Sequence, residues 1–177
     1  MKISLWLILI ALIIMCFPHA ILAQSDIKPI QIAIWHPVQI YDSTTSIHGF
    51  RFNLLYGVNK DIHGIDWGLV QKLNGNLKGW QNGCVNLVEG NVEGFQEGFV
   101  NHVKGNFSGL QYGIVNISMK HTVGVLAGFY NSTNHMKGVQ VGFVNITETL
   151  HGLQIGLVNI NNSGDPFKFL PIINYSF

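Results

Sequence analysis

The chain has 177 residues, of which 47% are hydrophobic and only 11% charged, and its formal net charge is +1. Soluble domains typically carry ~25% charged residues, so uncharged polar residues, glycine or lipid must cover the surface. The abundance of apolar residues excludes an intrinsically disordered chain. The lack of a basic run removes the electrostatic footprint of a nucleic-acid partner.

The first 23 residues are typical of a secretory signal peptide. Lys2 precedes an apolar run over residues 3–17, and Ala23 provides a small residue at the expected cleavage site. We therefore expect residues 1–23 to be removed on export. Two alternatives remain open. One is an uncleaved anchor helix, for which the apolar run falls short of the ~20 residues of a membrane span. The other is a lipoprotein modified at Cys16, although the residue before it is not small.

Residues 24–48 precede the repetitive part of the chain. Apolar and polar residues alternate over 30–34 and again over 38–41, with His36 and Pro37 between them. Alternation with a period of two predicts a pair of short strands. Such a pair can cap one end of a repeat array, which repeat proteins require, or begin a barrel.

Residues 49–160 contain eight tandem copies of one short unit. The consensus is Gly-Leu-Gln-x-Gly-Phe-Val-Asn followed by six or seven variable residues, and its first glycine recurs at steps of 15 or 14 residues, at Gly49, Gly64, Gly79, Gly94, Gly109, Gly124, Gly138 and Gly152. A fixed period of this kind is the signature of a repeat architecture. Asp66 and Leu126 are exceptions to the glutamine, and Gln71 replaces the closing asparagine.

The unit favours a β-strand over a helix. Two glycines per unit each cost a helix about 1 kcal/mol, whereas Val, Ile, Phe and Tyr favour strands. A single uninterrupted strand would place the glutamine and both glycines on one side of the sheet, and the Leu, Phe and closing Asn on the other. The predicted fold class is therefore all-β.

Two all-β architectures compete. In a β-solenoid, each unit is one coil of 14–15 residues, and equivalent residues stack on one another. Asn131, Asn145 and Asn159 would then form a ladder of side-chain amides. In a closed antiparallel outer-membrane-type barrel of about ten strands, each unit would be one strand and one turn. The single-unit period favours the solenoid, because antiparallel strands repeat naturally in pairs.

The C-terminal segment, residues 161–177, favours the barrel. Aromatic and aliphatic residues alternate with other residues up to Phe177, as in the last strand of outer-membrane barrels. Against the barrel, Asn82 and Glu97 would face lipid, and strands of about eight residues fall short of the ~9–11 that span a bilayer.

No set of residues indicates catalysis. Cys84 lies in Asn82-Gly83-Cys84-Val85-Asn86, which lacks the second glycine of a nucleophile elbow. It occupies the position that Phe or Ile holds in other copies, which predicts an apolar core residue. The histidines outside the leader fall mainly in the variable segments without ligand spacing and are expected on the surface, at His63, His102, His121, His135 and His151. We expect no catalytic, cofactor-binding or metal-binding residue, and no cofactor.

Several segments resemble a surface-repeat family of leptospires and other Gram-negative bacteria. They are the stretch over residues 51–57, the unit over 64–70, the Gly-Leu-Gln-Ile-Gly-Leu-Val-Asn copy at 152–159 and the Pro-Ile-Ile-Asn ending at 171–174. The resemblance covers essentially all of the chain after the leader. It implies a cell-envelope or surface location and no defined activity.

The sequence thus predicts an exported envelope or surface repeat protein with a structural or binding role and no enzymatic activity. The alternative is a small outer-membrane barrel acting as a pore or an anchor. The expected partner is an unidentified surface ligand or envelope component, with outer-membrane lipid as an alternative and nucleic acid excluded.

Overall fold

The computed structural model describes residues 27–177, and these residues form strands joined by short turns without a helix. The predicted signal peptide, residues 1–23, lies outside the described residues. The strands are β1 (Ile27–Trp35), β2 (Val38–Gln39), β3 (Ser46–Asn59), β4 (Ile62–Leu73), β5 (Leu77–Asn82), β6 (Val85–Val88), β7 (Val92–Val103), β8 (Phe107–Asn161) and β9 (Phe169–Ser176).

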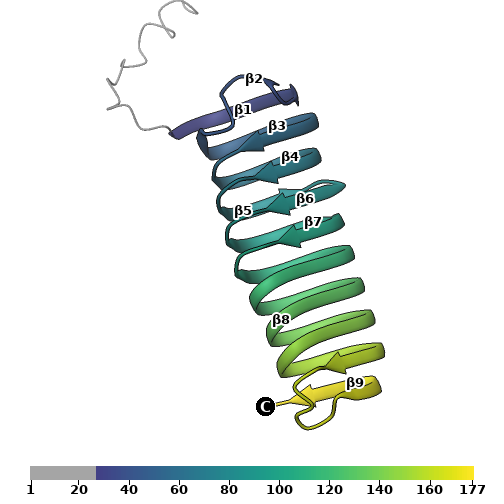
Figure 1. The fold of residues 1–177 in the computed structure, drawn as a ribbon. Helices are drawn as coiled ribbons and strands as arrows, with labels where there is room; N and C mark the ends of the chain where they lie inside the picture. The colour runs from purple at the N-terminus through teal and green to yellow at the C-terminus, as the bar shows by residue number, and fades with distance from the viewer. Residues whose placement is uncertain (1–26) are drawn as a thin grey trace, which may run out of the picture.

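The repeats wind into a β-solenoid, which confirms the predicted fold class (Figure 1). Successive coils pair in parallel with a shift of one repeat unit, so that Gly64 pairs with Gly79 and Gly79 with Gly94. The long strand β8 continues through several coils without a break. Parallel pairing of neighbouring coils contradicts the alternative of a closed antiparallel barrel. The physical reason is the single-unit period, since only parallel stacking places identical residues together.

Antiparallel strands occupy both ends of the stack. At the N-terminal end β1 continues the parallel ladder next to β3, and the short β2 pairs with β1 in the antiparallel sense. At the C-terminal end β9 runs antiparallel to the last coil of β8. The N-terminal strand pair therefore caps the solenoid, as one of the two sequence interpretations proposed.

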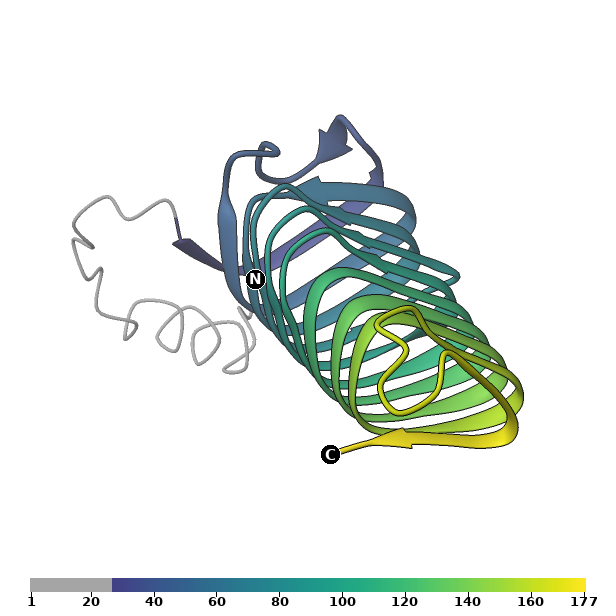
Figure 2. The same ribbon diagram turned by 60° about the horizontal axis from the view of Figure 1, so that its bottom comes forward.

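Each coil is a flattened loop with a narrow interior, visible in the view toward its end (Figure 2). One half of the interior is apolar. Ile62, Leu73, Leu77 and Val88 are at most 1% exposed and belong to a single core cluster that extends along the stack. Because each coil contributes only two such side chains, the core is a thin column rather than a globular centre.

The other half of the interior consists of two amide ladders. In the asparagine ladder each Nδ2 donates to the Oδ1 of the next coil at 2.7–2.8 Å, through Asn86, Asn101, Asn116, Asn131, Asn145 and Asn159. The glutamine ladder is built in the same way, with Nε2 of one coil donating to Oε1 of the preceding coil. The predicted asparagine ladder is confirmed, and it extends over more coils than predicted.

The predicted distribution of side chains over two faces is wrong. Gln96 and Asn101 are both fully buried, although their odd spacing should have placed them on opposite sides of a strand. The chain turns a corner just after Gly98, the corner glycine, and the alternation reverses between Phe99 and Asn101, where the backbone N–H groups of Phe99 and Val100 both donate to the carbonyl oxygen of Cys84. Both amides consequently face the interior, and the residues next to them in the chain face outward.

Both glycines of the unit have a steric role. Gly94 has φ +140°, and a Cβ atom there would overlap the carbonyl oxygen of Gly79 in the coil before. Gly98 leaves room for the ladder, because a Cβ there would lie 2.7 Å from Nδ2 of Asn86. The first glycine therefore allows the backbone of adjacent coils to approach, and the second allows the asparagine amides to stack.

Candidate functional site: an apolar exterior face

Cys84, expected in the core, instead points outward. It is only partly buried, and its counterparts in neighbouring coils, Phe99 and Phe129, are 61% and 57% exposed. The prediction failed because it equated apolar character with burial. Cys84 lies three residues after the buried Gln81, so alternation along the strand points it outward. The position belongs to the exterior surface.

The histidines lie on the outside of the coils, as predicted. Four of the five are exposed, and His102 is half-buried. Two pairs of histidines from adjacent coils stack, with ring centroids 4.2 Å apart for His48 and His63 and 4.5 Å apart for His121 and His135. Over residues 27–177 no three His, Cys, Asp or Glu side chains are grouped so that they could hold a metal ion.

Three rows of outward side chains run along the stack on one side and together form what we call the apolar face. Row 1 contains Ile30, Phe50, Ile65, Trp80, Phe95, Leu110, Val125, Val139, Leu153 and Tyr175. Row 2 contains Ile32, Phe52, Trp67, Asn82, Glu97, Tyr112, Ala127, Val141, Ile155 and Ile173. Row 3 contains Leu69, Cys84, Phe99, Ile114, Phe129, Phe143 and Leu157.

The side chains of the apolar face are well exposed. Trp67 is 56% and Tyr112 57% exposed, and both stand in row 2. Neighbours within a row stack, as for Phe129 and Phe143, whose rings are nearly parallel with centroids 4.9 Å apart. The interior ladders fix the register of the coils, so the rows are held at the spacing of adjacent strands, about 4.8 Å.

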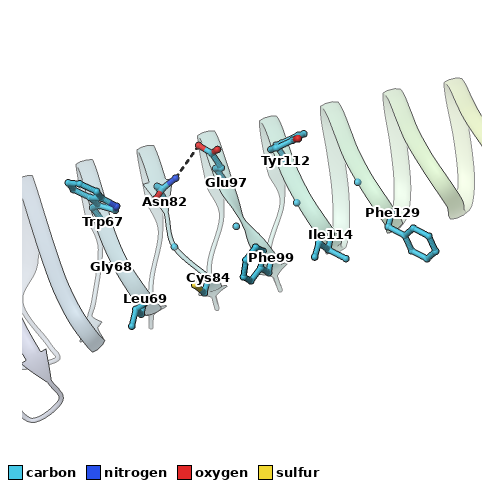
Figure 3. A pocket seen from close by; sticks show the side chains of 14 residues that line it. Trp67, Gly68, Leu69, Asn82, Cys84, Glu97, Phe99, Tyr112, Ile114 and Phe129 are labelled. Carbon is cyan, nitrogen blue, oxygen red and sulfur yellow. Dashed lines mark hydrogen bonds between the residues drawn. The ribbon is translucent and has the colours of Figure 1, made fainter.

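A groove separates row 2 from row 3 (Figure 3). Its floor is the line of corner glycines, including Gly83, Gly98 and Gly113, and its volume is about 690 Å³. Trp67 and Tyr112 form part of one wall, and the side chains of row 3 form the other. The corner glycines lie between the two rows, and a Cβ atom on them would point at the interior asparagines, so rows 2 and 3 alone project on either side of the groove.

Two polar side chains interrupt the apolar face near its middle. The amide Nδ2 of Asn82 donates to Oε2 of Glu97 at 3.1 Å (Figure 3). Both belong to row 2, between Trp67 and Tyr112. Glu97 is the only Asp, Glu, Lys, Arg or His in the three rows, so any partner that covers the face must accommodate one carboxyl group.

The remaining charged groups of the repeats lie on other sides of the coils. Lys78 pairs with Glu93 at 3.2 Å, and Lys104 with Glu89 at 2.7 Å. The hydrogen bond from Lys104 holds the pKa of Glu89 below its ordinary value. These exposed pairs contribute little to stability, but their position divides the exterior into a charged side and an apolar side.

A second ladder of side chains marks the turn opposite the corner glycines. Asp61 begins it, with Oδ1 accepting the backbone N–H of Asn76 at 2.7 Å, and Asn76 in turn accepts the backbone N–H of Asn91 at 2.8 Å. Burial raises the pKa of Asp61, but the hydrogen bonds from Asn76 and from the Ser46 hydroxyl outweigh burial and hold it below its ordinary value. This exterior ladder fixes the turns rather than forming a site.

Comparison of the chain with protein-family models, with curated proteins and with solved structures returns no match. The resemblance to the leptospiral-type surface-repeat family therefore stays a prediction from the motifs. Within residues 27–177 there is also no helix long and apolar enough to cross a membrane.

Proposed function

We propose that this chain is an exported cell-envelope or surface repeat protein with a structural or binding role and without catalysis. The observation that carries the proposal is the apolar face, which continues from β1 to β9 along one side of the solenoid. Contiguous exposed apolar patches on soluble proteins mark sites of contact with other molecules. The outward groups of this face offer contact area rather than chemistry.

The interior supports a structural role. A coil that stacks through two amide ladders and a thin apolar core is fixed relative to its neighbours, so the outward rows form a preorganised surface. Preorganisation lowers the entropic cost of binding, because the contacting side chains and backbone are already ordered. A rigid repeat of this kind suits a scaffold or a contact surface.

The case for export rests on residues 1–23 and on the family resemblance. A single free cysteine after the leader, Cys84, means that the fold is held by hydrogen bonds and packing rather than by disulfides. The resemblance to envelope proteins of Gram-negative bacteria supports the same location. The proposed partner is an envelope component or surface ligand that covers the apolar face.

Fractionation of cells that express the full chain tests the proposal. The expected result is recovery in the envelope fraction with an N-terminus at Gln24, measured by mass spectrometry, and digestion by protease added to intact cells. A Leu12→Arg variant, which interrupts the apolar core of the leader, should stay in the cytosol as the matched control. Recovery of the unaltered chain in the cytosol with residues 1–23 intact would contradict the proposal.

A further inference from the structure

The apolar face is long enough to support a stable interface. Row 2 runs from Ile32 in β1 to Ile173 in β9, which at about 4.8 Å per strand corresponds to roughly 40 Å. Rows 1 to 3 span four residues along the chain, roughly 15 Å with the side chains included. The resulting area is roughly 600 Å², at the upper end of apolar patches on monomers. Two such faces in contact would bury about 1,200 Å², the lower bound for specific interfaces.

We propose that a second copy of this chain covers the apolar face in a two-fold symmetric dimer. The two-fold axis lies in the interface, perpendicular to the long axis of the solenoid, and passes between the coils of Glu97 and Tyr112. The inference rests on the proposed function in one respect only, namely that the apolar face is the contact surface. It adds the identity of the partner and the geometry of the contact.

The position of the carboxylate selects this axis. Glu97 and Tyr112 are paired residues of adjacent coils and are the two middle members of row 2. An axis across the row reverses its order, so Glu97 faces the partner's Tyr112, and symmetry repeats the contact. The phenol then donates to one carboxylate oxygen while Asn82 already donates to the other. An axis along the solenoid would instead bring two Glu97 carboxylates together.

The shapes of neighbouring coils also match under this axis. Reversal of row 2 places Asn82 opposite the partner's Ala127, and Trp67 close to the partner's Val141, so that large side chains meet small ones.

Lipid fits the same face less well. An ionised carboxylate in hydrocarbon is costly, and Glu97 stands in the middle of the face rather than at its rim. Peripheral binding to anionic membranes also relies on basic residues beside the apolar surface, whereas no Lys, Arg or His belongs to rows 1 to 3. A second copy provides a hydrogen-bond donor for the carboxylate, which an acyl chain does not.

Sedimentation equilibrium of the purified exported chain measures the dimer dissociation constant. Ile114→Lys, in row 3 and 54% exposed in the free chain, should raise this constant at least 100-fold. Met119→Lys, equally apolar and 48% exposed but outside the face, is the matched control and should leave it unchanged. Far-ultraviolet circular dichroism of each variant confirms that the solenoid is intact.

Tyr112→Phe tests the geometry of the contact. Because symmetry repeats the contact, the substitution removes two hydrogen bonds to charged acceptors and should weaken the dimer at least about 100-fold. In a Glu97→Leu background the same substitution should have no further effect, because the acceptor is already gone. An equal effect of Tyr112→Phe in both backgrounds would overturn the proposed axis.

Three other results would overturn the dimer itself. The chain could sediment as a monomer at every concentration. It could be monomeric but float with vesicles of phosphatidylethanolamine and phosphatidylglycerol, which would make lipid the occupant. It could form assemblies that Ile114→Lys does not change, which would assign association to the strand edges. A monomer recovered at the cell surface would refute this inference while leaving the proposed function intact, and a dimer confined to the cytosol would do the reverse.

Discussion

Replacement of Asn145 by leucine tests how much the asparagine ladder contributes to stability. Nδ2 of Asn145 donates to the carbonyl oxygen of Ile155 at 3.0 Å and to Oδ1 of Asn159 at 2.8 Å, and its Oδ1 accepts from Nδ2 of Asn131 at 2.8 Å. All three asparagines are fully buried. Leucine has a similar size but provides neither a donor nor an acceptor.

The expected loss follows from what the substitution leaves unpaired. Nδ2 of Asn131 keeps the carbonyl oxygen of Val141 at 3.0 Å, so that amide remains partly satisfied. Oδ1 of Asn159 loses its donor inside the coil, which costs about 1–3 kcal/mol, and the bond to Ile155 contributes about 1 kcal/mol more. The free energy of unfolding should therefore fall by about 2–4 kcal/mol. For a chain of this size that lowers the melting temperature by roughly 4–16 °C.

Thermal melting followed by circular dichroism measures the change, with Val123→Thr as the control. Val123 is 48% exposed and lies outside the apolar face, so its substitution should alter stability by no more than about 0.5 kcal/mol. Coils that contact only their neighbours need not unfold in one step, so the two variants are compared by their midpoints under one protocol. Equal, small shifts for both would refute the account of a stabilising ladder.

Three further substitutions follow from the same geometry. Gly94→Ala adds a Cβ against a carbonyl oxygen at φ +140° and should lower the free energy of unfolding by at least about 2 kcal/mol. The control is Gly164→Ala, at φ +77° with no atom within 4 Å of the new Cβ, which should cost about 1 kcal/mol. Urea denaturation measures both. The guanidinium of Arg51 is fully buried and pairs with Asp66 at 2.6 Å. Asp66→Ala leaves it without a counter-ion and should lower the free energy of unfolding by about 3–5 kcal/mol. An unchanged urea midpoint would contradict this. The pKa of Asp61 is lower in the folded chain than in the unfolded chain. Its carboxylate therefore stabilises the fold at any pH above the unfolded pKa, and this stabilisation is lost as the pH falls through the folded pKa. Wild type should therefore lose more stability than Asp61→Asn when the pH is lowered below about 4, and parallel pH profiles would argue against it.

The sequence was sufficient to predict the coil and one of its ladders. A period of 14–15 residues places each residue on its own counterpart, and an amide is a side chain that can donate to and accept from a copy of itself. The ladder through Asn131, Asn145 and Asn159 follows from those two facts. It required no knowledge of the shape of the coil.

The apolar face was not predicted, because the corner was not. A strand that continued through this corner would place Phe99 and Asn101 on the same side, whereas the structure exposes Phe99 and buries Asn101. Low charge predicts a surface covered by uncharged polar residues, glycine or lipid, whereas the ladder amides lie inside and many apolar side chains lie outside. One signal was available in the repeats. The interior asparagine position barely varies among the repeats, while row 2 changes from Trp67 to Glu97 to Ala127, which is typical of an outward position.

The break in the glutamine ladder at Leu126 allows the two interior halves of the coil to be weighed against each other. Leu126 is fully buried where other coils have glutamine, and Oε1 of Gln111 is left without a donor. The same coil carries Thr122 at a position that is apolar in most other coils, and its hydroxyl bonds that of Thr133 at 2.7 Å. Apolar and polar groups have thus exchanged places within one coil.

Leu126→Gln should be nearly neutral for this reason. The new amide would donate to Oε1 of Gln111, which recovers about 1–3 kcal/mol, and the loss of a buried leucine costs about 1.5–3 kcal/mol. The free energy of unfolding should therefore stay within about 1 kcal/mol of wild type. Leu126→Ala, which only creates a cavity, should cost about 2–5 kcal/mol. Leu126→Glu has the same shape as glutamine but no donor for Gln111 when ionised, so it should be the least stable of the three. If glutamine proved as damaging as alanine, completion of the ladder would contribute nothing, and apolar packing alone would hold adjacent coils together.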